Sequence, residues 1–310
     1  MQLYIAIPSW KNKKILNLLR GKCTIRFNKT NNRLNKKQLI KIANRYDGII
    51  IGRLETIDKD VLSHSNLIFI GVAAAGLDNL DRKELAKKKI AIFYTPKTNA
   101  SSVAEHAMAL ILSLAKNIIN LNNSVRKGKF NKFRHSTFDV KGKTLGIIGA
   151  GAIGQEIIIR AKSFDMNIVC YTPHPDRHRD LDVKFTGLNE LLRKSDFVSI
   201  NIPLTDKSKH LIDEKELKLM KPTAFLINTS RGKIVNEKSL IKALKMKWIA
   251  GAGLDVFEKE PIPDKKLLKL ANLILTPHVA GVSKEAVLGM EEQLVKDIAA
   301  FLDGKAIAKY

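Results

Sequence analysis

Short apolar runs alternate with polar, helix-like segments along the first hundred residues of the chain. Four of these runs are β-branched and bounded by charge or glycine: Leu3–Ile7, Gly48–Ile51, Leu67–Ile70 and Ile90–Phe93. Such runs are typical of strands that are buried on both faces of a sheet. Segments with helical spacing separate them: Lys13–Arg20, Asn35–Asn44, Lys59–Ser63 and Asp81–Lys88. The alternation predicts a small parallel sheet with helices on both faces.

The same alternation begins again after residue 143 and continues for most of the remaining chain. Six runs predict strands: Thr144–Ile148, Asn167–Tyr171, Phe197–Ile200, Ala224–Asn228, Ala252–Asp255 and Leu273–Thr276. Four segments between them predict helices: Gly154–Ser163, Asn189–Lys194, Asp213–Leu219 and Glu237–Lys245. The predicted fold class is α/β, with a Rossmann doubly wound parallel sheet and a smaller flavodoxin-like α/β domain.

Two longer segments stand outside this alternation. Asn99–Leu121 is apolar nearly all round, which predicts one long buried helix at the junction of two domains. Lys284–Leu302 is amphipathic and predicts a single terminal helix. No segment is convincing as the roughly 20-residue apolar span that a membrane helix needs, and Pro8 and Lys11 interrupt the apolar start of the chain. We therefore expect a cytoplasmic protein without a membrane partner.

A glycine-rich turn directly follows one predicted strand and opens a predicted helix. It reads Gly149-Ala150-Gly151-Ala152-Ile153-Gly154. In this setting Gly149 permits a tight turn, Gly151 lets backbone approach a pyrophosphate at the helix N-terminus, and Gly154 lets helix and strand pack closely. The alternative is a packed turn that binds nothing, which the flanking strand and helix disfavour. We expect a dinucleotide site that includes Ala152 and Ile153.

The residues after the next strand bear on the choice of dinucleotide. A carboxylate at the end of this strand would accept the ribose hydroxyls of NAD, but the chain has Thr172 there, with Arg177 and Arg179 close behind. Threonine can hydrogen-bond to a 2′-phosphate and arginine can pair with it, so the sequence favours NADP over NAD. The alternatives are that Asp176 serves the ribose of NAD, or that the arginines simply face water.

Three chemically complementary residues follow three successive predicted strands. Arg231, Glu260 and His278 stand after the strands that end near residues 228, 255 and 276. Ligands collect at the carboxyl ends of strands in open α/β sheets. Arginine can bridge carboxylate and carbonyl oxygens, histidine can donate a proton near neutral pH, and a carboxylate can stabilise the imidazolium. Together these residues predict a catalytic set for reducing a 2-oxo acid.

Six short runs, in order, are similar to one enzyme family. They are Val103-Ala104-Glu105-His106, Gly142-Lys143-Thr144-Leu145-Gly146-Ile147-Ile148-Gly149, Ile202-Pro203-Leu204-Thr205, Asn228-Thr229-Ser230-Arg231-Gly232, Gly253-Leu254-Asp255-Val256-Phe257-Glu258 and Thr276-Pro277-His278. The chain from about residue 67 to 281 thus resembles the D-isomer-specific 2-hydroxyacid dehydrogenases, including glyoxylate/hydroxypyruvate reductases and phosphoglycerate dehydrogenases. The resemblance implies an NAD(P)-dependent oxidoreductase that reduces a small 2-oxo acid to the D-2-hydroxy acid.

The resemblance also implies roles for particular residues. Arg231 would bind substrate, His278 would donate the proton and Glu260 would be its partner. Cofactor contacts would come from the nicotinamide-side residue Asp255 and from three lining residues: Pro203, Thr229 and Ser230. It further implies a homodimer, a dinucleotide domain at 99–282, and a substrate domain split between 1–98 and 283–310.

The substrate-side loop Ala74-Ala75-Gly76 departs from the pattern of many members. These have arginine at the position of Val72 and a Gly-(Thr/Ser)-Gly turn in place of the three loop residues. Backbone N–H groups of the loop could still hold a substrate carboxylate. The missing arginine argues against a phosphorylated substrate. D-3-phosphoglycerate dehydrogenase is therefore kept as an alternative and not as the expected activity.

Composition and charge change this picture little. The formal net charge is +24, and residues 1–97 hold 20 Lys and Arg against 7 Asp and Glu, compared with 34 against 23 in residues 98–310. No single-strand platform or helix-turn-helix accompanies the charge, so we expect a solvated basic surface and no nucleic-acid partner. Two isolated cysteines and no metal-ligand spacing predict no metal site. A non-enzymatic redox sensor or corepressor on the same fold is the remaining alternative.

Overall fold

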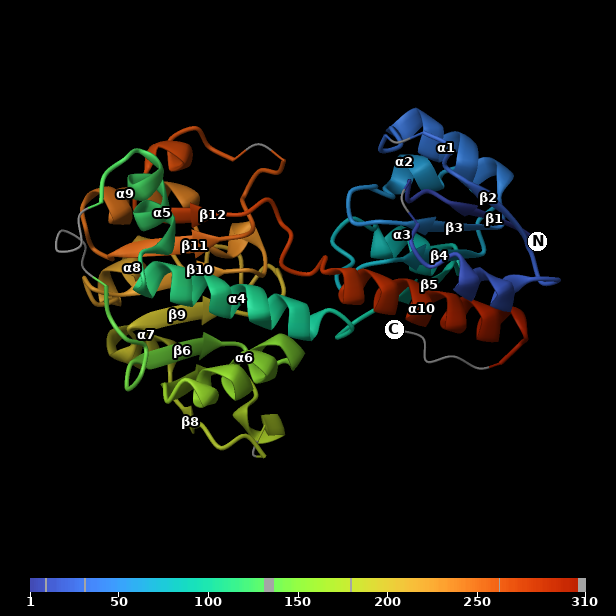
Figure 1. Ribbon diagram of the computed structural model, residues 1–310. Helices are drawn as coiled ribbons and strands as arrows, with labels where there is room; N and C mark the ends of the chain where they lie inside the picture. The colour runs from blue at the N-terminus through green and yellow to red at the C-terminus, as the bar shows by residue number, and fades with distance from the viewer. Residues whose placement is uncertain (9, 31, 131–136, 179, 262, 306–310) are drawn as a thin grey trace. The chain divides into compact units, whose positions relative to one another are not determined.

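The chain divides into two compact units, each built on a parallel sheet (Figure 1). The computed structural model describes residues 1–305 apart from 9, 31, 131–136, 179 and 262. Unit 1 comprises Met1–Asn99 and Val282–Tyr310, and unit 2 comprises Ala100–Gly281.

Unit 1 has a five-stranded, fully parallel sheet in the order β2-β1-β3-β4-β5. Its strands are β1 (Gln2–Ile5), β2 (Thr24–Phe27), β3 (Gly48–Ile51), β4 (Phe69–Val72) and β5 (Ala91–Tyr94). Its helices are η1 (Lys14–Leu19), α1 (Lys36–Arg45), α2 (Lys59–Leu62), α3 (Arg82–Lys87) and α10 (Lys284–Leu302). This strand order is that of flavodoxin-like sheets, as the sequence predicted.

Both faces of this sheet are covered, because each strand buries side chains alternately on either side. One core lies under α1, α2 and α3 and includes Ile49 and Ile70. The other contains Ile50 and Phe69 together with Leu294 and Ile298 of α10. The terminal helix, more than 180 residues distant in sequence from β5, therefore completes the core of unit 1.

Unit 2 has a seven-stranded parallel sheet in the order β12-β11-β10-β9-β6-β7-β8. Its strands are β6 (Thr144–Ile148), β7 (Asn167–Tyr171), β8 (Lys184–Phe185), β9 (Phe197–Ile200), β10 (Phe225–Asn228), β11 (Gly251–Leu254) and β12 (Leu273–Leu275). Its helical segments are α4 (Ala100–Ala115), α5 (Ile118–Arg126), α6 (Ala152–Ser163), η2 (Pro175–His178), α7 (Leu188–Lys194), α8 (Glu214–Leu219), η3 (Gly232–Ile234), α9 (Glu237–Lys245) and η4 (Leu267–Lys269). The strand order reverses between β6 and β9, which is the switch point of a Rossmann sheet.

The expected single helix over Asn99–Leu121 is wrong. The chain instead forms α4 and α5, which are bent by 61° relative to each other. Asn117, between them, has φ 52°, a left-handed conformation that asparagine tolerates and that ends a helix. Among the residues that the structure describes, no single helix is long and apolar enough to cross a membrane, whereas this bent pair reaches that size by length and composition alone.

Two short strands escaped the sequence prediction. β2, with the sequence Thr-Ile-Arg-Phe, lies at the edge of its sheet and is largely exposed, so it has no run of buried apolar residues. β8 has only two residues and is also an edge strand. Edge strands need not be apolar on both faces, which removes the pattern on which the prediction depended.

Candidate functional site

The carboxyl edge of the unit 2 sheet collects most of the residues singled out from the sequence. All seven strands are parallel, so the loops after β6, β7, β9, β10, β11 and β12 begin along the same edge. The loop after β6 begins the glycine turn. The loops after β7, β9, β10, β11 and β12 carry, in that order, Thr172, Pro203, the run Thr229–Arg231, Glu260 and His278. The sheet thus places a candidate dinucleotide turn and a candidate catalytic set on one edge.

The glycine turn has the geometry that each of its glycines was expected to provide. Gly149 has φ 103°, and a Cβ there would lie 2.6 Å from the backbone oxygen of Asn201. A Cβ on Gly154 would lie 2.1 Å from the backbone oxygen of Gly149, so the close approach of α6 to β6 requires glycine. A Cβ on Gly151, the N-cap of α6, would meet nothing within 4 Å. That open space lies at the positive end of a 12-residue helix, where a phosphate group fits.

The loop after β10 offers a second feature that fits a dinucleotide. Thr229 is 7% exposed, and its Oγ1 has no hydrogen-bond partner among the residues that the structure describes. A buried hydroxyl without a partner costs free energy, and a bound polar group would supply that partner. Ser230, also buried, is engaged within the protein by Asn228, whose Oδ1 accepts the Ser230 hydroxyl at 2.8 Å. Pro203 is exposed after β9, and its carbonyl accepts the Ser208 hydroxyl at 2.8 Å.

The loop after β7 is the region that would distinguish the two nicotinamide dinucleotides. Thr172 is half-buried directly after the strand, and no carboxylate occupies its position. Arg177 is exposed on the 3-10 turn η2, which also carries Asp176. Arg179 lies outside the described residues. The geometry therefore leaves the expected roles of Thr172, Arg177 and Arg179 as predictions.

The candidate proton donor and its carboxylate partner are in direct contact. Nδ1 of His278 lies 2.8 Å and 2.9 Å from the two carboxylate oxygens of Glu260. Both side chains are about one-quarter or less exposed, at 19% for His278 and 26% for Glu260. Glu260 also makes a hydrogen bond within its own loop, where its Oε1 accepts the N–H of Phe257 at 3.3 Å. The imidazole thus presents its other nitrogen, Nε2, away from the carboxylate.

Asp255 holds the loop that carries His278, a role that the sequence did not reveal. The Asp255 side chain is fully buried, and its oxygens accept the N–H groups of Val279 and Ala280, both at 2.9 Å, and the hydroxyl of Thr276 at 2.6 Å. His278 itself has φ 55°, a strained value for a residue with a side chain. Asp255 therefore holds the Thr276 side chain before the histidine and the backbone after it. Its expected contact with the nicotinamide stays a prediction.

His106 of α4 belongs to the same network. Its Nε2 lies 2.9 Å from the Thr276 hydroxyl and 3.7 Å from Asp255, across α4 and the end of β12. Its side chain is only 23% exposed. The partners of His106 are therefore residues that hold the His278 loop.

Arg231 is held by its own loop. Asn228, at the end of β10, donates from Nδ2 to the Arg231 carbonyl at 3.0 Å and accepts the Ser230 N–H at 3.1 Å. The guanidinium donates from one terminal nitrogen to the Ser230 carbonyl at 2.8 Å. An asparagine that bonds to backbone two and three residues ahead is a recognisable turn former, so this part of the loop was readable from its sequence.

The predicted substrate loop Ala74-Ala75-Gly76 follows β4 in unit 1. The N–H of Ala74 donates to the Val72 carbonyl at 2.8 Å, so that group is already used within the loop. The backbone of Ala74 also accepts from the N–H of Thr95 at 3.2 Å, which joins the ends of β4 and β5. A carboxylate cradle would have to rely on Ala75 and Gly76, and the role of this loop stays a prediction.

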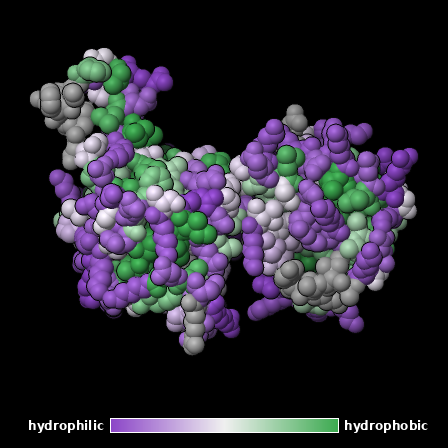
Figure 2. Space-filling model, turned by 60° about the horizontal axis from the view of Figure 1, so that its bottom comes forward, coloured by the Kyte–Doolittle hydropathy of each residue, from purple (hydrophilic) through white to green (hydrophobic). Residues whose placement is uncertain are grey.

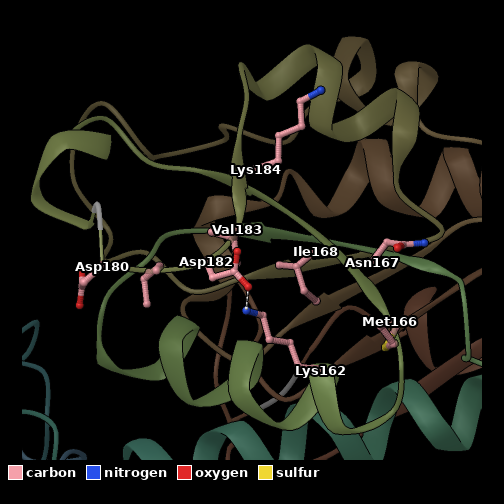
Figure 3. A pocket seen from close by; sticks show the side chains of 9 residues that line it. Lys162, Met166, Asn167, Ile168, Asp180, Asp182, Val183 and Lys184 are labelled. Atoms are coloured by element: carbon pink, nitrogen blue, oxygen red, sulfur yellow. Dashed lines mark hydrogen bonds and ion pairs between the residues drawn. The ribbon is translucent and has the colours of Figure 1, made fainter.

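A shallow hollow of about 600 Å³ lies away from these residues, at the amino end of β7 (Figure 3). It is lined by Lys162, Met166, Asn167, Ile168, Asp180, Leu181, Asp182, Val183 and Lys184. Nζ of Lys162 and Oδ2 of Asp182 are paired at 2.9 Å across it, while Asp180 and Lys184 lie on different sides (Figure 3). Its charged groups are of mixed sign and it opens on the opposite edge of the sheet from the glycine turn. We assign no ligand to it.

Comparison with known proteins identifies a family. The sequence model of the D-isomer specific 2-hydroxyacid dehydrogenase NAD binding domain matches residues 108–280, which is more than half of the chain. A glyoxylate reductase from Pyrococcus horikoshii is 43% identical over 277 residues, covering 86% of this chain and 83% of the relative. These matches do not favour the phosphoglycerate dehydrogenase or the non-enzymatic sensor considered above.

Solved structures support the same assignment over the whole chain. An acyclic imino acid reductase in complex with NADPH and D-Arg superposes with a TM-score of 0.91 at 27% identity, with 100% of each chain covered. A D-lactate dehydrogenase from Aquifex aeolicus in complex with NAD and lactic acid gives 0.86 at 28% identity, covering 98% of this chain and 96% of that one. The chain therefore belongs to the D-isomer specific 2-hydroxyacid dehydrogenase family, and it is a nicotinamide-dinucleotide-dependent oxidoreductase that interconverts a 2-oxo acid and a 2-hydroxy acid.

Proposed function

We propose that this protein reduces a small 2-oxo acid of the glyoxylate or hydroxypyruvate type to the D-2-hydroxy acid. The observation that carries the proposal is the contact of His278 with Glu260, at 2.8 Å, on the sheet edge that also carries Arg231. The similarity to a glyoxylate reductase at 43% identity supports a small substrate. Val72 stands where many members of the family have arginine, which argues against a phosphorylated substrate.

In the proposed mechanism, three side chains act on the substrate or on each other. The Arg231 guanidinium binds the substrate carboxylate and orients the carbonyl carbon. His278 donates a proton from Nε2 to the carbonyl oxygen, because its Nδ1 is directed to Glu260. Glu260 stabilises the imidazolium before transfer and fixes the orientation of the ring. The reduced nicotinamide supplies the hydride when the dinucleotide is bound.

The proposed dinucleotide site uses the glycine turn and the loops beside it. Its members are Gly149, Gly151, Ala152, Ile153, Gly154, Thr172, Arg177, Arg179, Pro203, Thr229, Ser230 and Asp255. The N–H groups at the start of α6 would hold the pyrophosphate. The Thr229 hydroxyl, which has no hydrogen-bond partner within the described part of the chain, would bond to the dinucleotide. These features support a dinucleotide in general and do not select NAD or NADP.

We further propose a preference for NADPH, based on the loop after β7. Thr172 lacks the negative charge that would repel a 2′-phosphate, and Arg177 is exposed nearby. One charge-assisted contact is worth roughly 1.5–3 kcal/mol, or about one to two decades in affinity. The test compares kcat/KM for NADPH and NADH in the wild type and in Thr172→Asp, which should lose the preference. A wild-type preference for NADH would instead indicate Asp176 as the ribose-binding carboxylate.

The substrate is tested by initial rates with glyoxylate, hydroxypyruvate, pyruvate and bulkier 2-oxo acids, each with both reduced dinucleotides. We expect the highest kcat/KM with glyoxylate or hydroxypyruvate and a D-configured product from the latter. A clear preference for a bulky or phosphorylated 2-oxo acid would contradict the proposal. Phosphohydroxypyruvate is the informative comparison, since it is the substrate on which the alternative activity would act.

We also propose that the protein is a cytoplasmic homodimer joined through unit 2. Helix α5 exposes Ile118, Ile119 and Val125, each between 45% and 56% exposed, and Phe130 follows at 88%. Hydrophobic residues interrupt the hydrophilic surface on the face shown in Figure 2. An exposed apolar group of this kind is typical of an interface. Light scattering at micromolar concentration should give the mass of two chains, and a monomer would contradict the proposal.

The positive charge of the chain requires no nucleic-acid partner in this proposal. At the surface of unit 1, Lys36 donates hydrogen bonds to the carboxylates of Asp58 and Asp60, and these bonds raise the pKa of the Lys36 ammonium. A solvated surface of this sign can attract anionic substrates by long-range electrostatics. Such attraction acts on the association of substrate and not on the chemical step, so raising the salt concentration should leave kcat unchanged. Retention of the protein on DNA at physiological salt would contradict the interpretation.

A further inference from the structure

The loops after β10 and β11 touch each other through their backbones. A Cβ added to Gly232 would lie 1.9 Å from the carbonyl carbon of Phe257 and 2.4 Å from the nitrogen of Glu258, so only glycine fits. Gly232 directly follows Arg231, and Glu260 comes two residues after Glu258. The distance between the two loops therefore determines how far apart the candidate substrate-binding arginine and the partner of His278 are held.

Two carboxylates close this contact in a reciprocal way. Oε1 of Glu258 accepts the backbone N–H of Glu237 at 3.0 Å, and Oε1 of Glu237 accepts the backbone N–H of Glu258 at 2.5 Å. We call this pair the glutamate clasp. Nε2 of His210 lies 3.1 Å from the same Glu258 oxygen. Glu237 is the first residue of α9 and is 8% exposed, so its carboxyl is not simply a solvated surface group.

The electrostatics of the clasp are unfavourable for a purely stabilising role. Burial raises the pKa of the Glu237 carboxyl, the N–H of Glu258 lowers it, and the charges of Glu258 and Asp264 raise it further. Holding two carboxyl groups together in a half-buried place costs free energy. Because this cost falls at the edge of the candidate active site, it indicates that the pair holds the loops after β10 and β11 in position.

Capping of α9 explains only one half of the clasp, the bond from the Glu237 N–H to Glu258. Asn236 is the N-cap of α9, and its Oδ1 already accepts the N–H groups of Lys238 and Ser239 at 3.1 Å and 3.3 Å. Asn236 is in turn bound to Asp213, at 3.1 Å. The Glu237 carboxylate, in contrast, accepts the N–H of Glu258 and satisfies no N–H group of the helix. What the clasp adds is a connection between the loop that carries Arg231 and the loop that carries Glu260.

We propose that Glu237 and Glu258 are positioning residues that set the separation of Arg231 from the Glu260–His278 pair. This inference rests on the proposed function, since it assigns roles to these three side chains. Loosening the clasp should misplace Arg231, which raises KM, and should weaken the contact of Glu260 with His278, which moves the pH dependence of turnover. Misplacement of about 1 Å in an active site can cost up to roughly 100-fold in rate.

The experiment uses four variants of the full chain: Glu258→Ala, Glu258→Gln, Glu237→Ala and Glu237→Gln. Steady-state rates with glyoxylate and saturating reduced dinucleotide are measured from pH 5 to pH 9, and folding is checked by circular dichroism and thermal melting. We expect the alanine variants to lose about 10- to 100-fold in kcat/KM, with a higher KM and a displaced pH profile. The glutamine variants keep an acceptor oxygen and should restore most of the activity and the wild-type profile.

The matched control is Asp196→Ala at the opposite, amino edge of the same sheet. Asp196 also accepts a backbone N–H, that of Thr144 at 2.8 Å, and pairs with Lys221 at 2.8 Å. This variant should lower the melting temperature without moving KM or the pH profile. The proposal is overturned if the clasp alanine variants behave like this control, or if the glutamine variants are as impaired as the alanine variants.

A double variant, Glu237→Ala with Glu258→Ala, tests whether the two residues act as one device. We expect it to be about as impaired as either single variant, and multiplied effects would mean separate roles. If one variant fails to fold, the other partner's variants decide the question. A readout without turnover separates this inference from the proposed function: the NMR titration of His278, assigned by His278→Gln, should shift in the alanine variants even if glyoxylate is not the substrate.

Discussion

Both sheets hold a strand-end loop by a buried carboxylate that accepts backbone N–H groups. In unit 2, Asp255 is fully buried and accepts the N–H groups of Val279 and Ala280, both at 2.9 Å. In unit 1, Glu291 of α10 is 2% exposed and accepts the N–H groups of Lys11 and Asn12, the latter at 2.5 Å. The physical device is the same in the two units, because a carboxylate satisfies several N–H groups at once.

The two loops differ in what they carry. The loop that Asp255 holds contains His278, with its strained backbone and its contact to Glu260. The loop that Glu291 holds, after β1, contains none of the predicted site residues. A buried carboxylate at a strand end is therefore not by itself a sign of function. Whether its loss affects chemistry or only stability should depend on the side chains of the loop it supports.

The largest effect in this comparison is expected from the side chain at the centre of the unit 2 loop. His278→Ala removes the proposed proton donor, and general acid catalysis is worth about 10²–10⁴-fold in kcat. Glu260→Gln should lower kcat by less than His278→Ala does. It should also move the pH at which the rate of reduction declines to a lower value, because the imidazolium loses its carboxylate partner. Steady-state rates from pH 5 to pH 9 measure both. Near-normal kcat in His278→Ala at neutral pH would exclude the role given to His278.

The next effect concerns the carboxylate that supports the histidine. Asp255→Asn keeps one acceptor oxygen but directs an amide N–H at a backbone N–H, so the loop with His278 should shift. We expect kcat/KM to fall by about 10- to 100-fold. Asp196→Asn, which alters a carboxylate at the amino edge of the sheet, is the control. If the two variants were equally active, Asp255 would not be positioning the catalytic loop.

A smaller effect is expected from the loop Ala74-Ala75-Gly76 of unit 1. Its predicted contact with substrate is made by the backbone, whereas the predicted catalytic residues of unit 2 act through their side chains. Ala75→Pro removes an N–H group that the sequence predicts to help Arg231 hold the substrate carboxylate, and the loss of one bond to a charged group is worth about tenfold or more in KM. Ala75→Ser keeps the N–H and is the control. Equal KM values in the two variants would mean that the backbone of this loop does not bind substrate.

The sequence was informative where chemistry and periodicity coincide. Arg231, Glu260 and His278 could be placed because each follows a strand whose apolar run is plain, and parallel strands share one carboxyl edge. The glycine turn was readable because its glycines are required by geometry, as the 2.1 Å approach at Gly154 shows. The contact of Glu258 with Glu237 could not be foreseen, because each of these carboxylates accepts a backbone N–H of the other residue.

Other features were beyond the sequence for a different physical reason. The partners of Asp255 and Glu237 are backbone N–H groups, which every residue except proline carries, so no residue type marks the contact. The break at Asn117 depends on one left-handed residue within an otherwise apolar helical pattern.

The smallest effect is expected from Glu291 and is the counterpart of the Asp255 experiment. Burial raises the pKa of the Glu291 carboxyl above its ordinary 4.5, although the N–H groups of Lys11 and Asn12 and the charge of Lys11 lower it. The folded state therefore binds this proton more tightly than the unfolded state does. Its contribution to the free energy of unfolding is fully present below pH 4.5 and is lost as pH rises through the raised value.

Glu291→Gln removes this titration while keeping one acceptor oxygen for the loop after β1. Thermal melting from pH 4 to pH 8 should show the wild type losing stability relative to the variant as pH rises, by no more than a few degrees. The kcat/KM of the variant should stay within about twofold of the wild type, since the loop carries no predicted site residue. A loss of activity comparable to that of Asp255→Asn would mean that the loop of unit 1 also positions groups for the reaction, and the contrast between the two units would then fail.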